Sequence, residues 1–245
     1  MNAVILAAGL GTRLRPLTDD RPKALVEVAG APMLEHQILH LRAAGFKRIV
    51  VNVHYMGQMI VDFLASKENF GIDIQVSDES DLLLDTGGGI ARAVSMFGSD
   101  EPVLVHNVDV FSDAPLAALY ERARGCDALL LVQERSSSRM LYFDDAMRLA
   151  GWKNIKSGEV KSPYEGFCED NFSPYAFSGI HILNAGVFNK MPRGEAFPLI
   201  PFYLSQAVDL NIKGEIFSAD GSWVDAGRPS DIEKAAEIVR KFYNK

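Results

Sequence analysis

Glycine and basic residues gather near the start of the chain, where residues 6–18 read LAAGLGTRLRPLT. Gly9 and Gly11 have no side chains, so phosphate oxygens can come close to their backbone N–H groups. Arg13 in the same segment, and Lys23 shortly after it, add positive charge. Because accessible N–H groups and positive charge together suit a ligand with several phosphates, this segment predicts a polyphosphate-binding loop.

Two widespread phosphate motifs do not match this segment. The dinucleotide fingerprint G-x-G-x-x-G requires a third glycine where Leu14 stands, and the P-loop pattern G-x-x-x-x-G-K-[ST] has no match in the chain. Gly9 and Gly11 alone would equally suit an ordinary turn that carries solvated arginines. The addition of Arg13 and Lys23 favours phosphate binding, and the missing third glycine argues against a dinucleotide-dependent oxidoreductase.

Two aspartates follow strand-like segments in distant parts of the chain. Asp109 lies in HNVDV (residues 106–110), and Asp225 lies in WVDAGRP (residues 223–229). Aspartate at the end of a strand often serves as a turn or capping residue. Mg²⁺, however, binds through one or two carboxylates together with substrate phosphates. Beside a phosphate-binding loop, the two aspartates therefore predict a Mg²⁺ site.

Five short runs rich in valine, isoleucine and leucine alternate with segments of helical periodicity in the first half of the chain. This alternation predicts an α/β fold with a doubly wound, mostly parallel sheet and helices on both faces. Ligands bind at the carboxyl edge of such a sheet, where the loop after the first strand lies. Since the runs are continuously apolar, we expect each strand to be covered on both faces. The expected strands span residues 3–7, 48–53, 73–77, 102–106 and 127–133, and the expected helices span residues 33–44, 58–66, 88–97 and 114–124, the last with Asp113 as its N-cap.

The pattern changes after about residue 134, where turn-forming residues separate short strand-like segments. This change predicts a β-rich insertion, a meander or hairpin, in the second half of the chain. Beyond it, the sequence predicts a strand at residues 176–183, a helix at 198–208, a strand at 215–224 and a closing helix at 229–243 with one apolar face. No linker or internal repeat separates these elements, so we expect a single domain over residues 1–245.

Charge and composition narrow the classes of partner. The formal net charge of the chain is −7, so its surface repels a nucleic-acid backbone and no nucleic-acid partner is expected. Residues 1–23 hold four basic and two acidic residues, which makes the phosphate-binding loop a basic island with a net charge of +2. No run approaches the roughly 20 apolar residues that span a bilayer, and no signal peptide is recognised, so we expect no membrane partner. Two cysteines in 245 residues fit a reduced, cytoplasmic compartment.

The motif Gly9-x-Gly11-Thr12-Arg13, followed by Pro16-Leu-Thr18 and Pro22-Lys23, resembles the signature of the sugar-1-phosphate nucleotidylyltransferases. These enzymes make a nucleotide sugar and pyrophosphate from a nucleoside triphosphate and a sugar 1-phosphate. The resemblance implies a Rossmann-like nucleotidyltransferase fold, with Arg13 and Lys23 as the catalytic cations. It also implies that the triphosphate is held by Ala8, Gly9, Gly11, Thr12, Arg13 and Lys23.

The same resemblance implies roles for residues further along the chain. Gly87, Gly88 and Asn107 would bind the nucleotide, the first two through backbone contacts to the base. Ser178 and Gly179 would bind the sugar. Asp109 and Asp225 match the metal ligands of the family, with Mg²⁺ as the cofactor. Many members carry Glu-Lys-Pro before the sugar-side strand, where this chain reads EVKSP (residues 159–163), so Lys161 and Arg193 are both candidates for the cation on the sugar phosphate.

The length of the chain is similar to that of the short subgroup of this family. That subgroup includes uridylyltransferases acting on N-acetylmuramate 1-phosphate and guanylyltransferases acting on mannose or heptose 1-phosphates. We expect UTP and N-acetylmuramate 1-phosphate or a related sugar phosphate as small-molecule substrates, in a monomer or small homo-oligomer. The nucleotide would bind in residues 1–134 and the sugar in residues 135–228, with a C-terminal helix at 229–245. A GTP-dependent guanylyltransferase and a non-catalytic regulatory subunit that binds nucleotide sugars are the alternatives.

Overall fold

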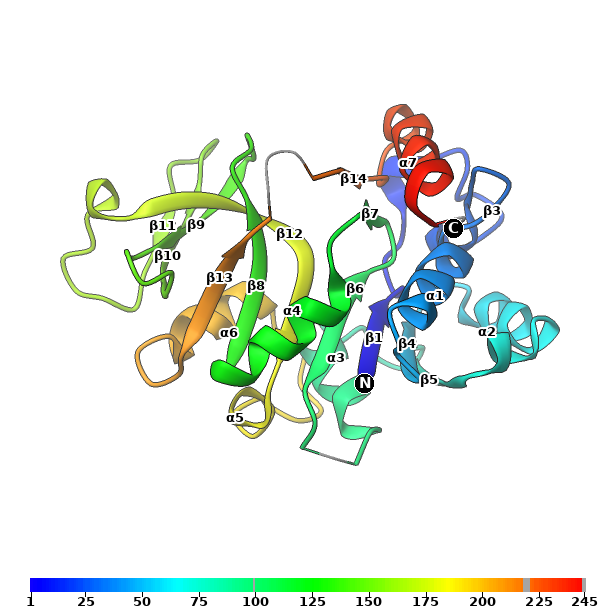
Figure 1. Ribbon diagram of the computed structural model, residues 1–245, viewed down its shortest axis with the longest axis horizontal. Coiled ribbons are helices and arrows are strands. Elements are labelled where there is room, and N and C mark those ends of the chain that lie inside the picture. The colour runs from blue at the N-terminus through cyan, green and yellow to red at the C-terminus, as the bar shows by residue number, and fades with distance from the viewer. Residues whose placement is uncertain (99, 218–220, 244–245) are drawn as a thin grey trace.

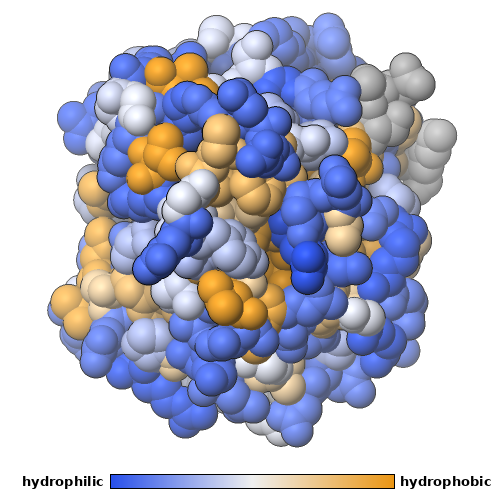
Figure 2. All heavy atoms as spheres, turned by 90° about the vertical axis from the view of Figure 1, so that its left-hand side faces the viewer, coloured by the Kyte–Doolittle hydropathy of each residue, from blue (hydrophilic) through white to orange (hydrophobic). Residues whose placement is uncertain are grey.

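The structure is a computed structural model that describes residues 1–98, 100–217 and 221–243. One continuous sheet runs through it, with parallel strands and most helices towards one end and antiparallel strands towards the other (Figure 1). Seen from the antiparallel end, the surface is largely hydrophilic with separate hydrophobic patches (Figure 2). Within the described ranges, every helix is too short or too polar to cross a membrane.

Four parallel strands form the half of the sheet that carries the N-terminus. β1 (Asn2–Leu6) pairs with β4 (Arg48–Val53) on one side and with β6 (Val103–Asn107) on the other, and β5 (Asp73–Asp78) pairs with β4. The first three are almost fully buried, as their continuous apolar runs predicted. The expectation of full coverage was wrong for β5, because it is the edge strand and its ends are exposed.

Helices cover both faces of these strands. α1 (Met33–Ala43) packs in one hydrophobic cluster with Ala3 and Ile5, and α3 (Asp85–Ser95) packs in a second cluster with Val4. Since neighbouring side chains of a strand point to opposite faces, this division confirms a sheet with helices on either side. The other helices of this half are α2 (Gly57–Ser66) and α4 (Leu116–Arg122).

Two helix predictions in this half were wrong in detail. α4 starts after Pro115 and not at Ala114, and Asp113 does not cap it, because its Oδ1 accepts the Ser222 N–H at 3.0 Å. Asp113 therefore joins two distant segments. α3 begins three residues before the predicted start, at Asp85, and ends at Ser95.

The second half is built on antiparallel pairing, which confirms the predicted β-rich insertion. β12 (Ser173–Leu183) is its central strand: its last residues lie between β6 and β8 (Ala128–Gln133), and its first residues pair with β9 (Arg139–Phe143). β9 then pairs with β10 (Leu149–Asn154), and β10 pairs with β11 (Val160–Lys161). A meander of three strands therefore extends from the edge of the α/β core.

The single strand predicted at residues 215–224 was wrong. β13 (Ile212–Ile216) runs parallel to β8, whereas β14 (Trp223–Asp225) pairs antiparallel with β7 (Val110–Ser112). Residues 218–220, which belong to that prediction, lie outside the described residues. An alternating pattern cannot indicate that consecutive residues join two different sheets.

The remaining elements are short. The predicted helix at 198–208 is α6 (Leu199–Gln206), and the predicted closing helix consists of a 3₁₀ turn (Pro229–Asp231), α7 (Ile232–Ile238) and a π-helical turn (Val239–Tyr243). Ala235, Ala236 and Val239 pack in the cluster of α1, as the apolar face predicted. Smaller pieces are β2 (Glu27–Val28), β3 (Ala31–Pro32), α5 (Ala185–Phe188) and 3₁₀ turns at Thr12–Leu14, Lys23–Leu25, Glu68–Gly71, Ala123–Gly125 and Glu169–Asn171.

Candidate active site

A cavity of about 1080 Å³ opens at the carboxyl ends of β1 and β6. The loop after β1 and the residues after β6 line one part of it. β9, β10 and β11 of the meander line another part, and the start of α6 contributes further lining residues. The cavity therefore lies between the parallel and antiparallel halves, at the sheet edge where α/β folds bind ligands.

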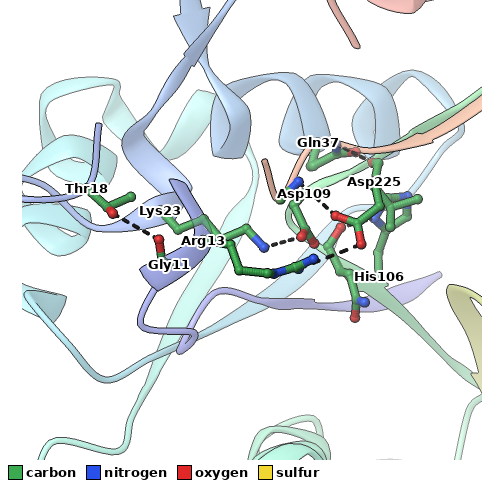
Figure 3. A network of polar contacts seen from close by, with 11 residues as sticks. Gly11, Arg13, Thr18, Lys23, Gln37, His106, Asp109 and Asp225 are labelled. Carbon is green, nitrogen blue, oxygen red and sulfur yellow. Dashed lines mark hydrogen bonds and ion pairs between the residues drawn. The ribbon is translucent and has the colours of Figure 1, made fainter. Parts of the chain in front are cut away.

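The predicted phosphate-binding loop lies against this cavity. Ala8, Gly9 and Arg13 line it, whereas Gly11 and Thr12 do not. Gly11 has a backbone φ of +66°, and a Cβ atom there would lie 2.9 Å from Thr18 Cγ2 and 3.0 Å from Lys23 Cβ. The Thr18 hydroxyl also donates a hydrogen bond to the Gly11 carbonyl oxygen at 2.9 Å (Figure 3). Gly11 is therefore required for the turn and for the close approach of Lys23, and not as a wall of the cavity.

Two cations point from this region toward two carboxylates (Figure 3). Lys23 Nζ donates to Asp109 Oδ2, and Arg13 Nη2 lies 3.8 Å from Asp225 Oδ2. The side chains of Lys23 and Asp109 are 14% and 10% exposed, whereas those of Arg13 and Asp225 are 55% and 40% exposed. The four charges balance, with one pair buried and the other open to solvent.

Asp109 and Asp225, which are far apart in the sequence, meet through the β7–β14 pair. In that ladder Asp225 lies opposite Val110, and the Ala226 N–H donates to the Asp109 carbonyl oxygen at 2.8 Å. The Asp225 carboxylate is fixed in turn, because its Oδ1 accepts the Gly227 N–H at 2.8 Å. Their carboxylates are close enough for each to change the pKa of the other.

Gly227 is a site residue that the sequence analysis missed. A Cβ atom there would lie 2.5 Å from Arg13 Nη2 and 2.7 Å from Asp225 Oδ1. The absence of a side chain therefore lets the arginine and the aspartate approach each other. The motif WVDAGRP could have indicated this role, because a glycine two residues after a candidate metal ligand suggests close packing at that ligand.

The two carboxylates have opposite pKa shifts. Burial raises the pKa of Asp225, and the negative charge of Asp109 raises it further. Burial also acts to raise the pKa of Asp109, but the charge and hydrogen bond of Lys23 outweigh it and the pKa is lowered. Asp109 thus favours its ionised form, whereas burial and the nearby Asp109 make the negative charge of Asp225 the less favourable of the two.

This arrangement fits a hard divalent cation. No group of three or more histidine, cysteine, aspartate or glutamate side chains with metal-binding geometry occurs among the described residues. Two adjacent carboxylates are nevertheless the set that Mg²⁺ uses when phosphates and water supply its other ligands. The negative charge of Asp225, which burial and Asp109 make unfavourable, is the kind of charge that a bound cation would neutralise.

Buried polar residues hold the segment that carries Asp109. Gln37 of α1 is fully buried, and its Nε2 donates to the Val110 carbonyl oxygen at 2.7 Å. His106 of β6 is also buried, and its Nδ1 donates to the Asn107 carbonyl oxygen at 2.8 Å. Burial lowers the pKa of His106 to about 4, so the imidazole beneath the site is neutral near pH 7.

Gly87 and Gly88, predicted to contact the base, pack against the segment before α6. The Gly87 N–H donates to the Phe197 carbonyl oxygen at 2.9 Å, and a Cβ atom at Gly88 would lie 2.4 Å from the Glu195 carbonyl oxygen. Neither glycine lines the cavity, but Asp85 and Thr86 just before them do. A role of the two glycines in nucleotide binding stays a prediction, while their packing role is evident. Asn107, the third predicted nucleotide-binding residue of this group, does line the cavity.

A buried polar pair on the same wall was not predicted. Glu79 is 1% exposed, and its Oε1 accepts the Asn52 Nδ2–H at 2.7 Å. The second carboxylate oxygen, Oε2, accepts the Leu84 N–H at 3.2 Å, and Asn52 Oδ1 accepts the Ala7 N–H at 2.8 Å. Asn52 lies near the end of β4 and Glu79 just after β5, at the carboxyl edge of the sheet. Polar residues at that edge could have been predicted from the sequence to border a ligand site.

The predicted sugar-binding residues lie behind the cavity wall. Ser178 is 1% exposed, and Gly179 has a backbone φ of +81° with Asn107 Nδ2 only 2.7 Å from the position of a Cβ atom. Neither lines the cavity, whereas Phe177 and His181 on either side of them do. Gly179 lies where the pairing of β12 with β8 shifts register, which explains the glycine, and contact of either residue with a sugar stays a prediction.

The meander supplies a wall that the sequence analysis largely missed. Arg139, Trp152, Asn154, Glu159 and Lys161 line the cavity from β9, β10 and the segment that forms β11. Lys161 Nζ lies 3.1 Å from Glu159 Oε1 and 5.4 Å from the centre of the Trp152 ring. Of the two candidate cations for the sugar phosphate, Lys161 is on the cavity and Arg193 is not among its lining residues.

Comparison with known proteins matches the whole length of this fold. The family model described as nucleotidyl transferase covers residues 2–241. The N-acetylmuramate alpha-1-phosphate uridylyltransferase of Caulobacter vibrioides is 35% identical over 93% of this chain and 92% of that protein. The protein of the same name from Neisseria meningitidis serogroup B is 31% identical over 98% of both chains. The mannose-1-phosphate guanyltransferase of Gibberella zeae is 32% identical over 95% of this chain, which spans 62% of that longer protein.

Solved structures show the same fold at lower sequence identity. HddC from Yersinia pseudotuberculosis, in a complex with GMP-PN, is 22% identical with a TM-score of 0.73 over 96% of this chain and 98% of that one. A UDP-glucose pyrophosphorylase in a complex with UDP-glucose is 18% identical with a TM-score of 0.74 over 98% of both chains. These likenesses confirm the predicted α/β fold class with its mostly parallel central sheet.

Proposed function

The chain belongs to the nucleotidyl transferase family, as a sugar-1-phosphate nucleotidyltransferase, and we propose that it transfers the uridylyl group of UTP to N-acetylmuramate 1-phosphate. The observation that carries the reaction type is the cluster of Arg13, Lys23, Asp109 and Asp225 beside the glycine loop. The choice of UTP and of this sugar is supported by the two uridylyltransferases that match the chain over nearly its full length.

In the proposed reaction an oxygen of the sugar phosphate attacks the α-phosphorus of the triphosphate. The bond from that phosphorus to the oxygen that bridges to the β-phosphate breaks, and pyrophosphate leaves. Since the attacking oxygen is already anionic, no general base is needed. Catalysis then depends on positioning and on positive charge near the reacting phosphoryl group.

Lys23 and Arg13 supply that charge from the protein. The buried contact with Asp109 fixes the Lys23 ammonium at the cavity wall before substrate binds. Arg13 is more exposed, and its planar fork suits the terminal phosphates that leave as pyrophosphate. Ala8 and Gly9 bring the loop backbone to the same wall, so we propose that they and the adjoining Gly11–Thr12 turn cradle the triphosphate.

Members of the family generally use a divalent metal, and we propose Mg²⁺, with Asp109 and Asp225 as its ligands. When bound, the ion would neutralise phosphate charge as the pyrophosphate leaves. Asn107, Gly87 and Gly88 are proposed to border the nucleotide, and Lys161 to meet the sugar phosphate.

A screen of pyrophosphate release tests the proposal. UTP, GTP, CTP, dTTP and ATP would each be combined with the 1-phosphates of N-acetylmuramate, N-acetylglucosamine, glucose, mannose and a heptose, in Mg²⁺. We expect the highest kcat/KM for UTP with N-acetylmuramate 1-phosphate. A higher value for any other pair would contradict the proposed substrates, although the reaction class would stand.

A second candidate is a GTP-dependent mannose 1-phosphate guanylyltransferase. It is favoured by the 32% identity to such enzymes, although this chain spans 62% of their length. The GTP and mannose arms of the same screen test it directly. Nucleotide-sugar binding without pyrophosphate release from any pair would instead support a non-catalytic regulatory subunit.

A further inference from the structure

Arg139 stands out among the residues that line the cavity. It begins β9, and its side chain is exposed to the cavity on the meander wall. Its backbone N–H bonds to Ser137 Oγ at 3.3 Å. The guanidinium, however, forms no hydrogen bond or ion pair with any residue in the described ranges 1–98, 100–217 and 221–243.

Three other basic side chains of the meander have acidic partners. Lys153 Nζ donates to Glu169 Oε1 at 2.7 Å on the other face of the strands, and Arg148 Nε lies 2.8 Å from Asp144 Oδ2 in the β9–β10 turn. Lys161, on the cavity wall itself, is paired with a glutamate at 3.1 Å. Arg139 is therefore the basic side chain of this wall whose charge is not compensated.

Strand geometry directs Arg139 into the cavity. Arg139 lies opposite Asn154 in the β9–β10 ladder, and Asn154 and Trp152 both line the cavity. Lys153, between those two, points to the opposite face, as alternation along a strand requires. The orientation of Arg139 therefore follows from the register of the sheet.

The surroundings of Arg139 suit a sugar that carries a second negative charge. Trp152 and Phe177 offer aromatic surface to a sugar ring, and Asn154 offers polar contacts. In the proposed reaction the sugar phosphate must reach the α-phosphorus near Lys23, at the opposite part of the cavity. Since Lys161 on the same wall is already proposed to meet that phosphate, Arg139 is left for a different anionic group of the same substrate.

We infer that Arg139 binds a carboxylate on the sugar ring and thereby selects an acidic sugar 1-phosphate over its neutral counterpart. This inference rests on the proposed function, which supplies the sugar 1-phosphate. A guanidinium fork binds a planar carboxylate through two parallel hydrogen bonds, so it discriminates by geometry as well as by charge. N-acetylmuramate has such a carboxylate and N-acetylglucosamine lacks it, while the two sugars otherwise share their ring.

The kinetic test compares these two sugar 1-phosphates at saturating concentration of the triphosphate that gives the highest turnover. We expect Arg139→Gln to raise KM for N-acetylmuramate 1-phosphate by about 10- to 100-fold and KM for N-acetylglucosamine 1-phosphate by less than about 3-fold. KM for the triphosphate should not change. Arg139→Lys should fall between wild type and Arg139→Gln, because it keeps the charge and loses the fork.

Arg148→Gln is the matched control, since Arg148 lies in the same meander but does not line the cavity. It should leave all kinetic constants at wild-type values. Equal increases in KM for both sugars in Arg139→Gln would show that Arg139 holds the phosphate and would overturn the inference. A wild-type enzyme without preference for the acidic sugar would overturn it as well.

A binding measurement separates this inference from the proposed function. Free N-acetylmuramic acid and N-acetylglucosamine would be titrated by isothermal titration calorimetry, which requires no turnover. Tighter binding of the acid by wild type, lost in Arg139→Gln, would support the role of Arg139 even if no pair of substrates released pyrophosphate. Turnover of sugar 1-phosphates together with equal binding of the two free sugars would leave the proposed function intact and refute the role of Arg139.

Discussion

Lys23 and Asp109 form a buried ion pair at the parallel end of the cavity, whereas Arg139 and Lys161 project from short antiparallel strands at the other end. At the parallel end, Arg13, Lys23, Asp109 and Asp225 form two ion pairs, and the backbone of β7 and β14 fixes both carboxylates. At the meander end, the guanidinium of Arg139 has no hydrogen-bond or ion-pair partner among the described residues. Under the proposed function, the first region would serve the transfer reaction itself, and the second would serve the choice of sugar.

The largest expected effect comes from breaking the buried pair. Lys23→Ala removes the cation that we propose to lie nearest the reacting phosphoryl group, so we expect kcat to fall by about 100- to 1000-fold. Steady-state pyrophosphate release measures kcat. The unfolding temperature in the presence of Mg²⁺ should change little by comparison. Lys67→Ala is the control, because that lysine pairs with Glu35 on the surface outside the cavity. Near wild-type turnover in Lys23→Ala would refute the assignment of Lys23.

Replacement of Asp225 should separate activity from stability. Burial and the charge of Asp109 raise the pKa of Asp225, so its ionised form destabilises the protein when no cation is bound. We expect Asp225→Asn to lower kcat by about 100-fold and to raise the unfolding temperature in EDTA by roughly 2–4 °C. Asp73→Asn, at an exposed pair with Arg48, should change neither. A lower unfolding temperature in Asp225→Asn would show that the carboxylate is structural.

Gly227→Ala tests the contact that joins the loop to the carboxylates. The new Cβ atom would lie 2.5 Å from Arg13 Nη2, so the guanidinium must move away from Asp225. We expect KM for the triphosphate to rise about 10-fold, since a charge-assisted contact to phosphate is misplaced. Gly125→Ala is the matched control, because a Cβ atom there meets nothing within 4 Å. An unchanged KM in Gly227→Ala would show that Arg13 does not contact the triphosphate.

The predictability of the two regions from sequence differs for a physical reason. β4 could be predicted to its last residue because four of its six residues, Ile49, Val50, Val51 and Val53, are apolar and β-branched. The loop residues and Asp109 also stood out, since each follows a buried strand at the sheet edge. Asp109 and Asp225 meet because β7 pairs with β14. The sequence did not indicate this pair, because a single strand was wrongly predicted over residues 215–224.

At the meander end, the sequence carried little signal. Arg139 follows a run of serines and is indistinguishable from a solvated arginine until its strand register is known. Gly179 was assigned to the sugar, yet its positive φ and its contact with Asn107 serve the packing of β12. Gly87 and Gly88 similarly fit under the segment before α6. Glycines required by packing between distant segments look the same in a sequence as glycines required by a ligand.

A smaller effect is expected on the pH dependence of stability, at the seam between the two regions that the paired strands β6 and β12 form. His106 of β6 and His181 of β12 are buried in adjoining strands, and the nitrogens of His181 have no hydrogen-bond partner among the described residues. Burial lowers the pKa of His106 to about 4 and that of His181 to about 3. Below about pH 6.5 both histidines become protonated in the unfolded chain but stay neutral in the folded protein. The contribution of these histidines to the free energy of unfolding is therefore fully present above that pH. It is lost as the pH falls, by on the order of 1 kcal/mol per pH unit for each histidine.

His181→Leu tests whether this seam titrates. An apolar side chain of similar size removes one titrating group and leaves no unpaired nitrogen, so the free energy of unfolding should fall less steeply between pH 6.5 and 4.5. Urea unfolding at several pH values measures both slopes. His40 and His106, whose pKa values burial lowers to about 4, and the carboxylates are present in both wild type and variant, so the difference between the slopes reports the removal of His181. Equal slopes would show that His181 is protonated or hydrated in the folded protein. Water or charge would then be present where β6 and β12 join the two halves of the cavity.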